Sequence, residues 1–180
     1  MLNQGICDKT KVGEICSVAK QIKLDCLEDS SITIDDKNVM SLIRTPEVNQ
    51  NVSFIAAIPS IRSLVLSLQQ KIGNSENVKG IVMDGRDIGT VVFPKAQLKI
   101  FLVADPKTRA LRRAIEMRQA GFEPNEEQLM KDLLERDRID SERAIAPLKK
   151  ADDAIEIDTS TVSFDEQVQK IVALAKERIQ

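Results

Sequence analysis

Residues 80–94 read GIVMDGRDIGTVVFP, and this stretch decides the fold class of the chain. The apolar run at 81–83 is typical of a buried strand, and the following Asp-Gly turns the chain before Arg86 and Asp87. A planar guanidinium suits phosphate, and a carboxylate accepts hydrogen bonds from amino or hydroxyl groups. Because an open parallel sheet binds ligands where its strands end, we expect a ligand site at this Arg-Asp pair.

A β-hairpin is the alternative interpretation of the same stretch. Asp-Gly between two β-rich runs is a strong hairpin signal, and residues 90–93 would then form the return strand. The local pattern does not separate the two interpretations, so other segments have to decide.

A second charged segment, residues 135–148, reads ERDRIDSERAIAPL. It follows a helical run in which Asn125 and Gln128 have capping-box spacing. If that helix continues, one narrow arc of its surface carries Arg136, Asp140 and Arg143. Two arginines flanking an aspartate could form a polyanion-binding surface, and a solvated helix face with internal salt bridges is the alternative.

Strand–helix alternation in the second half of the chain predicts an α/β fold with a parallel sheet. Buried strands are expected at 79–83, 98–103 and 154–157, and helices at 106–120 and 163–179. The helix at 106–120 carries three arginines on one side, with Leu111 and Ile115 opposite: Arg109, Arg112 and Arg113. A solvated basic face is the alternative interpretation of these arginines.

The first half of the chain predicts shorter elements. A helix is expected at 11–21, three short strands at 23–27, 31–35 and 39–43, and two further helices that begin at Thr45-Pro46 and at Pro59.

Composition restricts the chemistry and the partners. With 26 basic and 28 acidic side chains, the net charge is −2, so we expect neither nucleic acid nor a membrane as partner. The absence of histidine excludes Ser-His and Cys-His nucleophilic mechanisms. The three cysteines lack C-x-x-C spacing and predict reduced thiols in a cytoplasmic protein. Neither a signal peptide nor a membrane-spanning run is recognisable.

Four strings, DGRDIGTVVFP, LKIFLVADPKTRALRR, ERDRIDSERAIAPL and ADDAIEIDTS, together resemble the bacterial cytidylate kinases. The resemblance implies a P-loop NTPase-like parallel sheet flanked by helices, with a small insert that binds nucleoside monophosphate. It implies one domain over residues 1–180. Within it, the insert and its flanking helices occupy 10–58, the core 59–180, and a short arginine-rich lid 106–121.

The resemblance also implies the activity, which is transfer of the ATP γ-phosphoryl group to CMP or dCMP, with Mg²⁺ accompanying ATP. It assigns seven residues to CMP binding: Ser53, Arg62, Arg86, Asp87, Arg136, Asp140 and Arg143. Lid arginines, here Arg109, Arg112 and Arg113, would stabilise charge on the transferring phosphoryl group. No protein ligand for the metal is identified.

The sequence contains no G-x-x-x-x-G-K-[ST] pattern, the loop that cradles the phosphates of ATP in P-loop kinases. In the family this loop lies near the N-terminus, so we expect a strand, the loop and a helix, roughly forty residues, to be missing before Met1. The chain is therefore expected to be inactive and aggregation-prone by itself, and the intact protein to be a monomer. The alternatives are a non-catalytic fragment or pseudoenzyme with a partial CMP site, and a module that another chain completes.

Overall fold

A computed structural model describes residues 8–27, 31–43, 45–75, 79–119 and 121–179. The chain divides into two compact units, Met1–Met83 and Asp84–Gln180, and each unit is described by itself. The thiol of Cys7 and the expected helix end at Ala120 lie outside the described residues.

The first unit combines a small antiparallel sheet with helices. Its elements are a 3₁₀ turn at Lys9–Lys11, α1 (Val12–Gln21), β1 (Leu24–Cys26), β2 (Ile32–Ile34), β3 (Lys37–Asn38), α2 (Pro46–Ala57) and α3 (Pro59–Gly73). The strands pair in the order β1-β2-β3. A strand was expected at 39–43, and this prediction is wrong. Asp35 and Asp36 have φ values of 49° and 64° and form a two-residue turn, so the return strand begins at once at Lys37.

Helix starts in the first unit are as predicted. The Thr45 side chain accepts a hydrogen bond from the Val48 amide, and proline occupies the first turn of both α2 and α3. Ile15 of α1 packs with Ile58 and Ile61 to form the core. No described helix is by itself long and apolar enough to cross a membrane, although α2 and α3, bent by 97°, pass that test as a pair.

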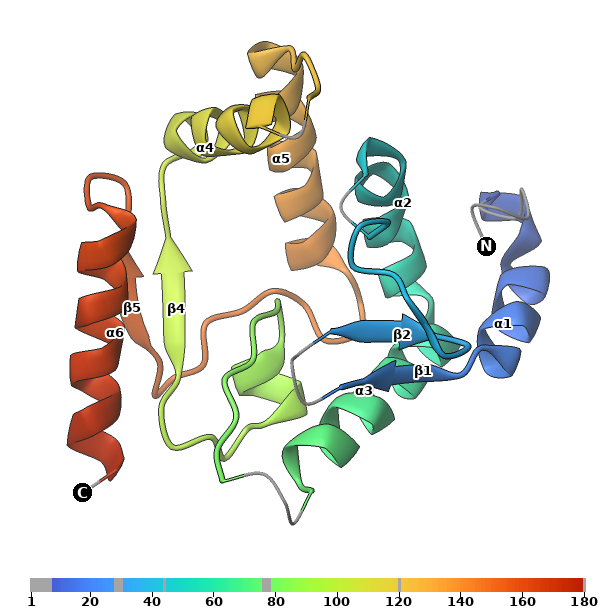
Figure 1. Ribbon diagram of the computed structural model, residues 1–180, viewed down its shortest axis with the longest axis horizontal. Helices are drawn as coiled ribbons and strands as arrows, with labels where there is room; N and C mark the ends of the chain where they lie inside the picture. The colour runs from blue at the N-terminus through green and yellow to red at the C-terminus, as the bar shows by residue number, and fades with distance from the viewer. Residues whose placement is uncertain (1–7, 28–30, 44, 76–78, 120, 180) are drawn as a thin grey trace. The chain divides into compact units, whose positions relative to one another are not determined.

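The second unit is α/β, as predicted. Its elements are a π-helix at Ile88–Val92, β4 (Ile100–Val103), α4 (Pro106–Gln119), α5 (Glu126–Glu142), β5 (Ile155–Asp158) and α6 (Phe164–Ile179). Among the described residues β4 and β5 form a two-stranded parallel sheet, with Ile100 opposite Ile155, and helices flank it (Figure 1). Asn125 caps α5 by accepting a hydrogen bond from the Gln128 amide at 3.0 Å.

Two expectations for residues 79–93 are wrong. Residues 80–83 are not a strand, because a parallel strand exists only through its ladder partner and no described strand pairs with this run. Val82 is fully exposed. The hairpin alternative is also excluded, since residues 88–92 form a π-helix in place of a return strand.

Candidate active site

A π-helical turn positions Arg86 and Asp87. The Asp87 carbonyl accepts a 2.8 Å hydrogen bond from the Val91 amide, and the Phe93 amide donates to the Ile88 carbonyl at 2.7 Å. A Cβ at Gly85 would lie 2.9 Å from the Ile88 side chain, so a larger residue here would force that side chain to shift. Single π-turns occur frequently at functional sites, because they redirect side chains without ending the local hydrogen bonding.

Asp140 is the centre of an arginine cluster. It is 3% exposed, and three guanidinium groups surround its carboxylate. The distances are 3.2 Å to Arg86 Nε, 3.8 Å to Arg136 Nε and 3.6 Å to Arg143 Nη1. Arg143 Nη2 also lies 3.7 Å from Asp87 Oδ1, so the cluster joins the π-helical turn to α5. Five of the seven residues assigned to CMP binding therefore come together here, and we call them the Asp140 cluster.

The loop after α5 is folded back onto this cluster. The Leu148 amide donates to the Asp140 carbonyl at 2.7 Å, and Arg143 Nε donates to the Ala146 carbonyl at 2.7 Å. Ala146 has a φ of 49°, a conformation that costs free energy for any residue with a Cβ. These hydrogen bonds offset the strain at Ala146, and the bond from Arg143 Nε fixes where the Arg143 guanidinium lies.

The cluster carries more positive than negative charge. Three guanidinium groups face two carboxylates, those of Asp87 and Asp140. Burial, followed by the neighbouring Arg86, lowers the pKa of Arg136 from its ordinary value, and Asp140 opposes the shift. Arg136 Nε and Asp140 Oδ2 are buried and make no hydrogen bond within the described part of the chain. The two atoms lie 3.8 Å apart and form an ion pair without a hydrogen bond, so each keeps hydrogen-bonding capacity that suits a phosphate or a hydroxyl group.

The arginines of α4 have separate partners. Arg109 Nη2 lies 2.5 Å from Asp137 Oδ2 of α5. Arg112 donates to the backbone carbonyls of Thr159 and Val162, which follow β5. Arg113 pairs with Glu116, one turn along the same helix, at 2.7 Å. The three arginines are half-buried, so the arginine side of α4 is not a solvated basic face, and Leu111 and Ile115 on the opposite side are exposed.

The remaining two predicted residues belong to the first unit. Ser53 lies on α2, and Arg62 lies on α3, where its Nη1 donates to the Ala56 carbonyl at 3.2 Å. Both side chains are half-buried.

Sequence reasoning missed Asp137. The available signal was its position directly after Arg136, because successive helix residues point about 100° apart and Asp137 therefore lies outside the main arc. The Asp137 carboxylate pairs with Arg109, one of the arginines of α4.

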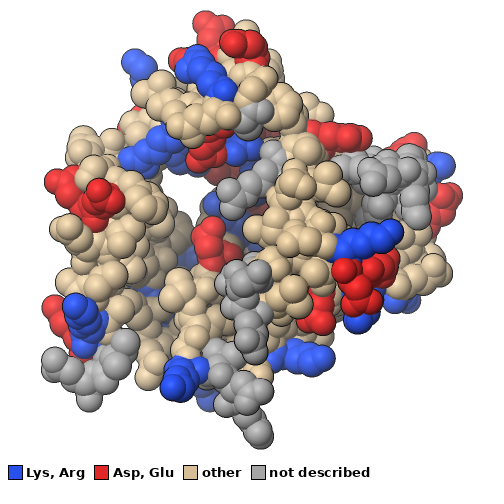
Figure 2. Space-filling model, viewed as in Figure 1, with Lys and Arg blue, Asp and Glu red and all other residues tan. Residues whose placement is uncertain are grey.

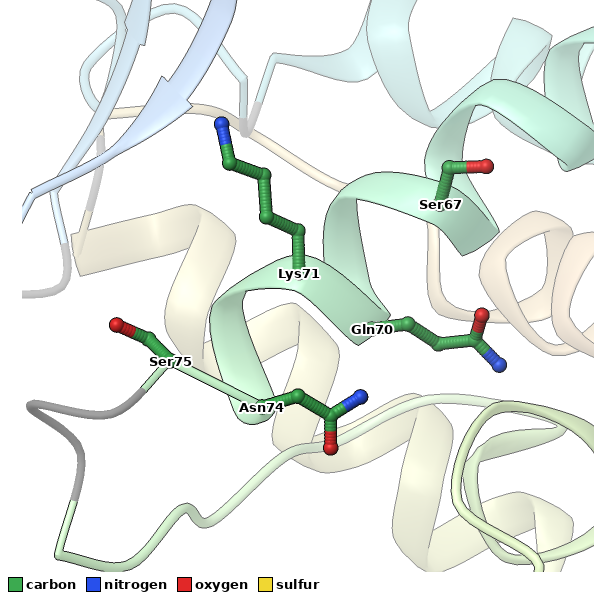
Figure 3. A pocket seen from close by; sticks show the side chains of 5 residues that line it. All are labelled: Ser67, Gln70, Lys71, Asn74 and Ser75. Carbon is green, nitrogen blue, oxygen red and sulfur yellow. The ribbon is translucent and has the colours of Figure 1, made fainter.

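Other surface features are weaker candidates for a functional site than the Asp140 cluster. A shallow pocket on α3 is lined by Ser67, Gln70, Lys71, Asn74 and Ser75, whose side chains diverge instead of converging on one point (Figure 3). Basic and acidic side chains are interspersed on the face seen in Figure 2, as the small net charge implies. Within the described ranges no three cysteine or acidic side chains are placed to hold a metal ion.

Comparison with known proteins identifies the family. The fold and the arginine cluster are consistent with a nucleoside monophosphate kinase, and the family model for cytidylate kinase matches residues 1–177. The chain is 48% identical over 144 residues to a cytidylate kinase of Anoxybacillus flavithermus, which covers 80% of this chain and 63% of that protein. Cytidylate kinases of Bacillus cereus and Bacillus thuringiensis are each 41% identical over 164 residues, covering 89% of this chain and 72% of theirs. The chain therefore belongs to the cytidylate kinase family, and it spans less than two thirds of the length of the Anoxybacillus protein.

Proposed function

We propose that this chain supplies the acceptor side of a cytidylate kinase, which binds CMP or dCMP and presents its phosphate to ATP. The single observation that carries the proposal is the Asp140 cluster, with its excess of guanidinium charge and its buried Arg136–Asp140 ion pair, whose atoms make no hydrogen bond within the described residues. A nucleoside monophosphate offers hydrogen-bond partners for both atoms, because it combines a dianionic phosphate with ribose hydroxyl groups.

The roles follow from the donor and acceptor inventory. Arg86 and Arg136 bind the phosphate, and the Asp140 carboxylate accepts a hydrogen bond from a ribose hydroxyl. Asp87 accepts a hydrogen bond from the exocyclic amino group of cytosine, and Arg143 donates to its ring acceptors. Uracil presents the opposite polarity at two positions and would leave buried groups unpaired, so such a site discriminates strongly. For Ser53 and Arg62 of the first unit, the assignment to cytosine recognition rests on the resemblance alone.

The ATP side needs a phosphate-binding loop that residues 1–180 do not contain. We infer that the chain transfers phosphate only when such a loop reaches it from outside these residues, in the same or another polypeptide. A non-catalytic CMP-binding fragment is the second candidate, favoured by the same missing pattern. Within α4, Arg109 and Arg113 act on the phosphates of ATP, and Arg112 holds the helix in place through its carbonyl partners.

Magnesium fits this chain only as an ion carried by ATP. Mg²⁺ binds through one or two carboxylates together with substrate phosphates, and the described acidic side chains form no three-membered cluster. The free thiols of Cys16 and Cys26 support a reducing cytoplasmic setting. By itself the chain is prone to aggregate, because Leu102 and Phe164 expose apolar surface and the β4 edge away from β5 is unpaired among the described residues. The complete enzyme is a monomer.

The test is a pair of measurements on the 180-residue chain. In a coupled assay with ATP, Mg²⁺ and CMP we expect negligible turnover, because the backbone amides and lysine of a P-loop supply most of the charge stabilisation. Calorimetric titration should nevertheless show CMP binding, with UMP binding at least about tenfold more weakly. Turnover of about 1–100 s⁻¹, as in ordinary kinases, would refute the dependence on an external loop. Absence of CMP binding by the folded chain would refute the acceptor-site assignment.

A further inference from the structure

Asp137 lies between two groups of arginines in the second unit. Its carboxylate is in contact with Arg109 of α4, and in the sequence of α5 it directly follows Arg136. Its negative charge acts on Arg136 as well, since it helps Asp140 to oppose the lowering of that pKa by burial and by Arg86. Asp137 is thus the carboxylate shared between α4 and the Asp140 cluster.

The Arg109–Asp137 pair is more than a surface salt bridge. Both side chains are largely covered, with exposed fractions of 29% and 27%. The two residues are 28 positions apart in the sequence and join the two helices of this unit that contact each other most extensively. The Nε of Arg109 is buried and has no hydrogen-bond partner within the described ranges, so this guanidinium retains a donor for a further acceptor.

We propose that Asp137 is a placeholder carboxylate, which holds the Arg109 guanidinium until a phosphate group of a polyphosphate ligand replaces it. The proposal rests on the proposed function in one respect, namely that the polyphosphate is the ATP of the phosphoryl transfer. The exchange is favourable on physical grounds, because Arg109 stays paired throughout and never becomes an isolated buried charge. A guanidinium also binds phosphate with the same two-pronged geometry that it uses for carboxylate.

The alternative is that Asp137 is a structural strut, a residue that only positions Arg109. The two roles predict opposite changes in the affinity for a polyanion when the charge of Asp137 is removed. A placeholder competes with the ligand and repels it, so removing its charge should strengthen binding of a polyanion. A strut positions Arg109 for the ligand, so removing its charge should weaken binding. The change Asp137→Asn separates the two because it preserves the size of the side chain and removes only the charge.

The experiment is a calorimetric titration of the monomeric fraction of the 180-residue chain with inorganic tripolyphosphate. We expect Asp137→Asn to bind it about 2–5-fold more tightly than the unaltered chain, the range for loss of one competing ion pair. Asp137→Glu, which keeps the charge, should stay close to the unaltered chain. Asp132→Asn is the matched control, because it makes the same charge change on an exposed position of α5.

A double variant assigns the gain to Arg109. In Arg109→Ala the further change Asp137→Asn should give no more tightening than the Asp132→Asn control, because the released guanidinium is gone. The proposal is overturned if Asp137→Asn binds tripolyphosphate no better than the unaltered chain or loses its helical circular dichroism. It is also overturned if the gain persists without Arg109, or if neither chain binds tripolyphosphate. A separate CMP titration distinguishes this outcome from failure of the acceptor site, which tripolyphosphate does not test.

Discussion

The arginines of α4 and those of the Asp140 cluster differ in how their charge is balanced. Arg112 and Arg113 each have their own partners, two backbone carbonyls and Glu116 respectively. Around Asp140, by contrast, three guanidinium groups share one buried carboxylate. Both regions are arginine-rich in the sequence. The Asp140 cluster therefore differs from α4 in the number of partners that the fold provides for each arginine.

Removing the Asp140 carboxylate, which three arginines share, should have the largest effect on stability. Asp140→Ala leaves the guanidinium of Arg143, itself 7% exposed, without its closest buried counter-charge. We expect a loss of about 3 kcal/mol in the free energy of unfolding, the low end for a broken buried pair, because Arg86 and Arg136 remain partly solvated. Urea titration followed by circular dichroism measures it. A loss below about 1 kcal/mol, typical of a surface pair, would remove the distinction between the two regions.

Asp87→Ala tests whether the Asp140 cluster recognises the cytosine base as well as the phosphate. The variant removes the acceptor that we assign to the amino group of cytosine, and CMP affinity should fall about 10–100-fold while tripolyphosphate affinity hardly changes. Calorimetry with both ligands gives the answer, and Asp84→Ala serves as the control on the exposed side of the same turn. Equal losses for CMP and tripolyphosphate would instead give Asp87 a purely structural role in the turn.

Arg112→Lys tests whether Arg112 stabilises the position of α4 or binds CMP. Lysine keeps the charge but cannot reach both carbonyls with one planar fork, so the free energy of unfolding should fall by about 1–2 kcal/mol. CMP affinity should not change. The neighbouring Arg113→Ala, which breaks only a pair within one turn, should cost less than about 0.5 kcal/mol. A CMP affinity that falls with the Arg112 change would place this side chain at the acceptor site.

Asn125→Ala should affect stability but not CMP binding. It deletes the cap of α5 at the end remote from Asp140, at a cost of about 1 kcal/mol in the free energy of unfolding. The affinity for CMP should remain as it was, because the cluster lies near the other end of the helix. Thermal unfolding and a CMP titration on the same sample check both statements, and Asn125→Ser, which restores a capping oxygen, should recover the stability.

Local sequence rules predicted the helix starts well, together with the strands β1, β2, β4 and β5. Thr45 with Pro46, and Asn125 with Gln128, act within one turn of the chain, so their geometry is contained in their spacing. The stripe formed by Arg136, Asp140 and Arg143 likewise follows from the helical period, and the structure brings these side chains together.

Interactions between distant segments were not predictable in the same way. The run at 80–83 has the composition of β4, yet only β4 has a described ladder partner. Arg112 and Thr159 are 47 residues apart, and nothing local indicates that this arginine would bind backbone carbonyls. The π-helix at Ile88–Val92 depends on the fit of the Ile88 side chain over Gly85, which the Asp-Gly turn signal does not contain. Sequence patterns specify periodicity, whereas partners depend on the tertiary fold.

Amide hydrogen exchange with and without saturating CMP tests the central claim most directly. The account predicts slower exchange in two segments when CMP binds, the turn at 84–93 and the stretch at 136–148. Exchange in α4 should be nearly unchanged, because its arginines keep their own partners in the absence of a polyphosphate. Protection confined to α4, or no protection at either cluster segment while CMP is bound, would contradict the assignment of the Asp140 cluster as the CMP site.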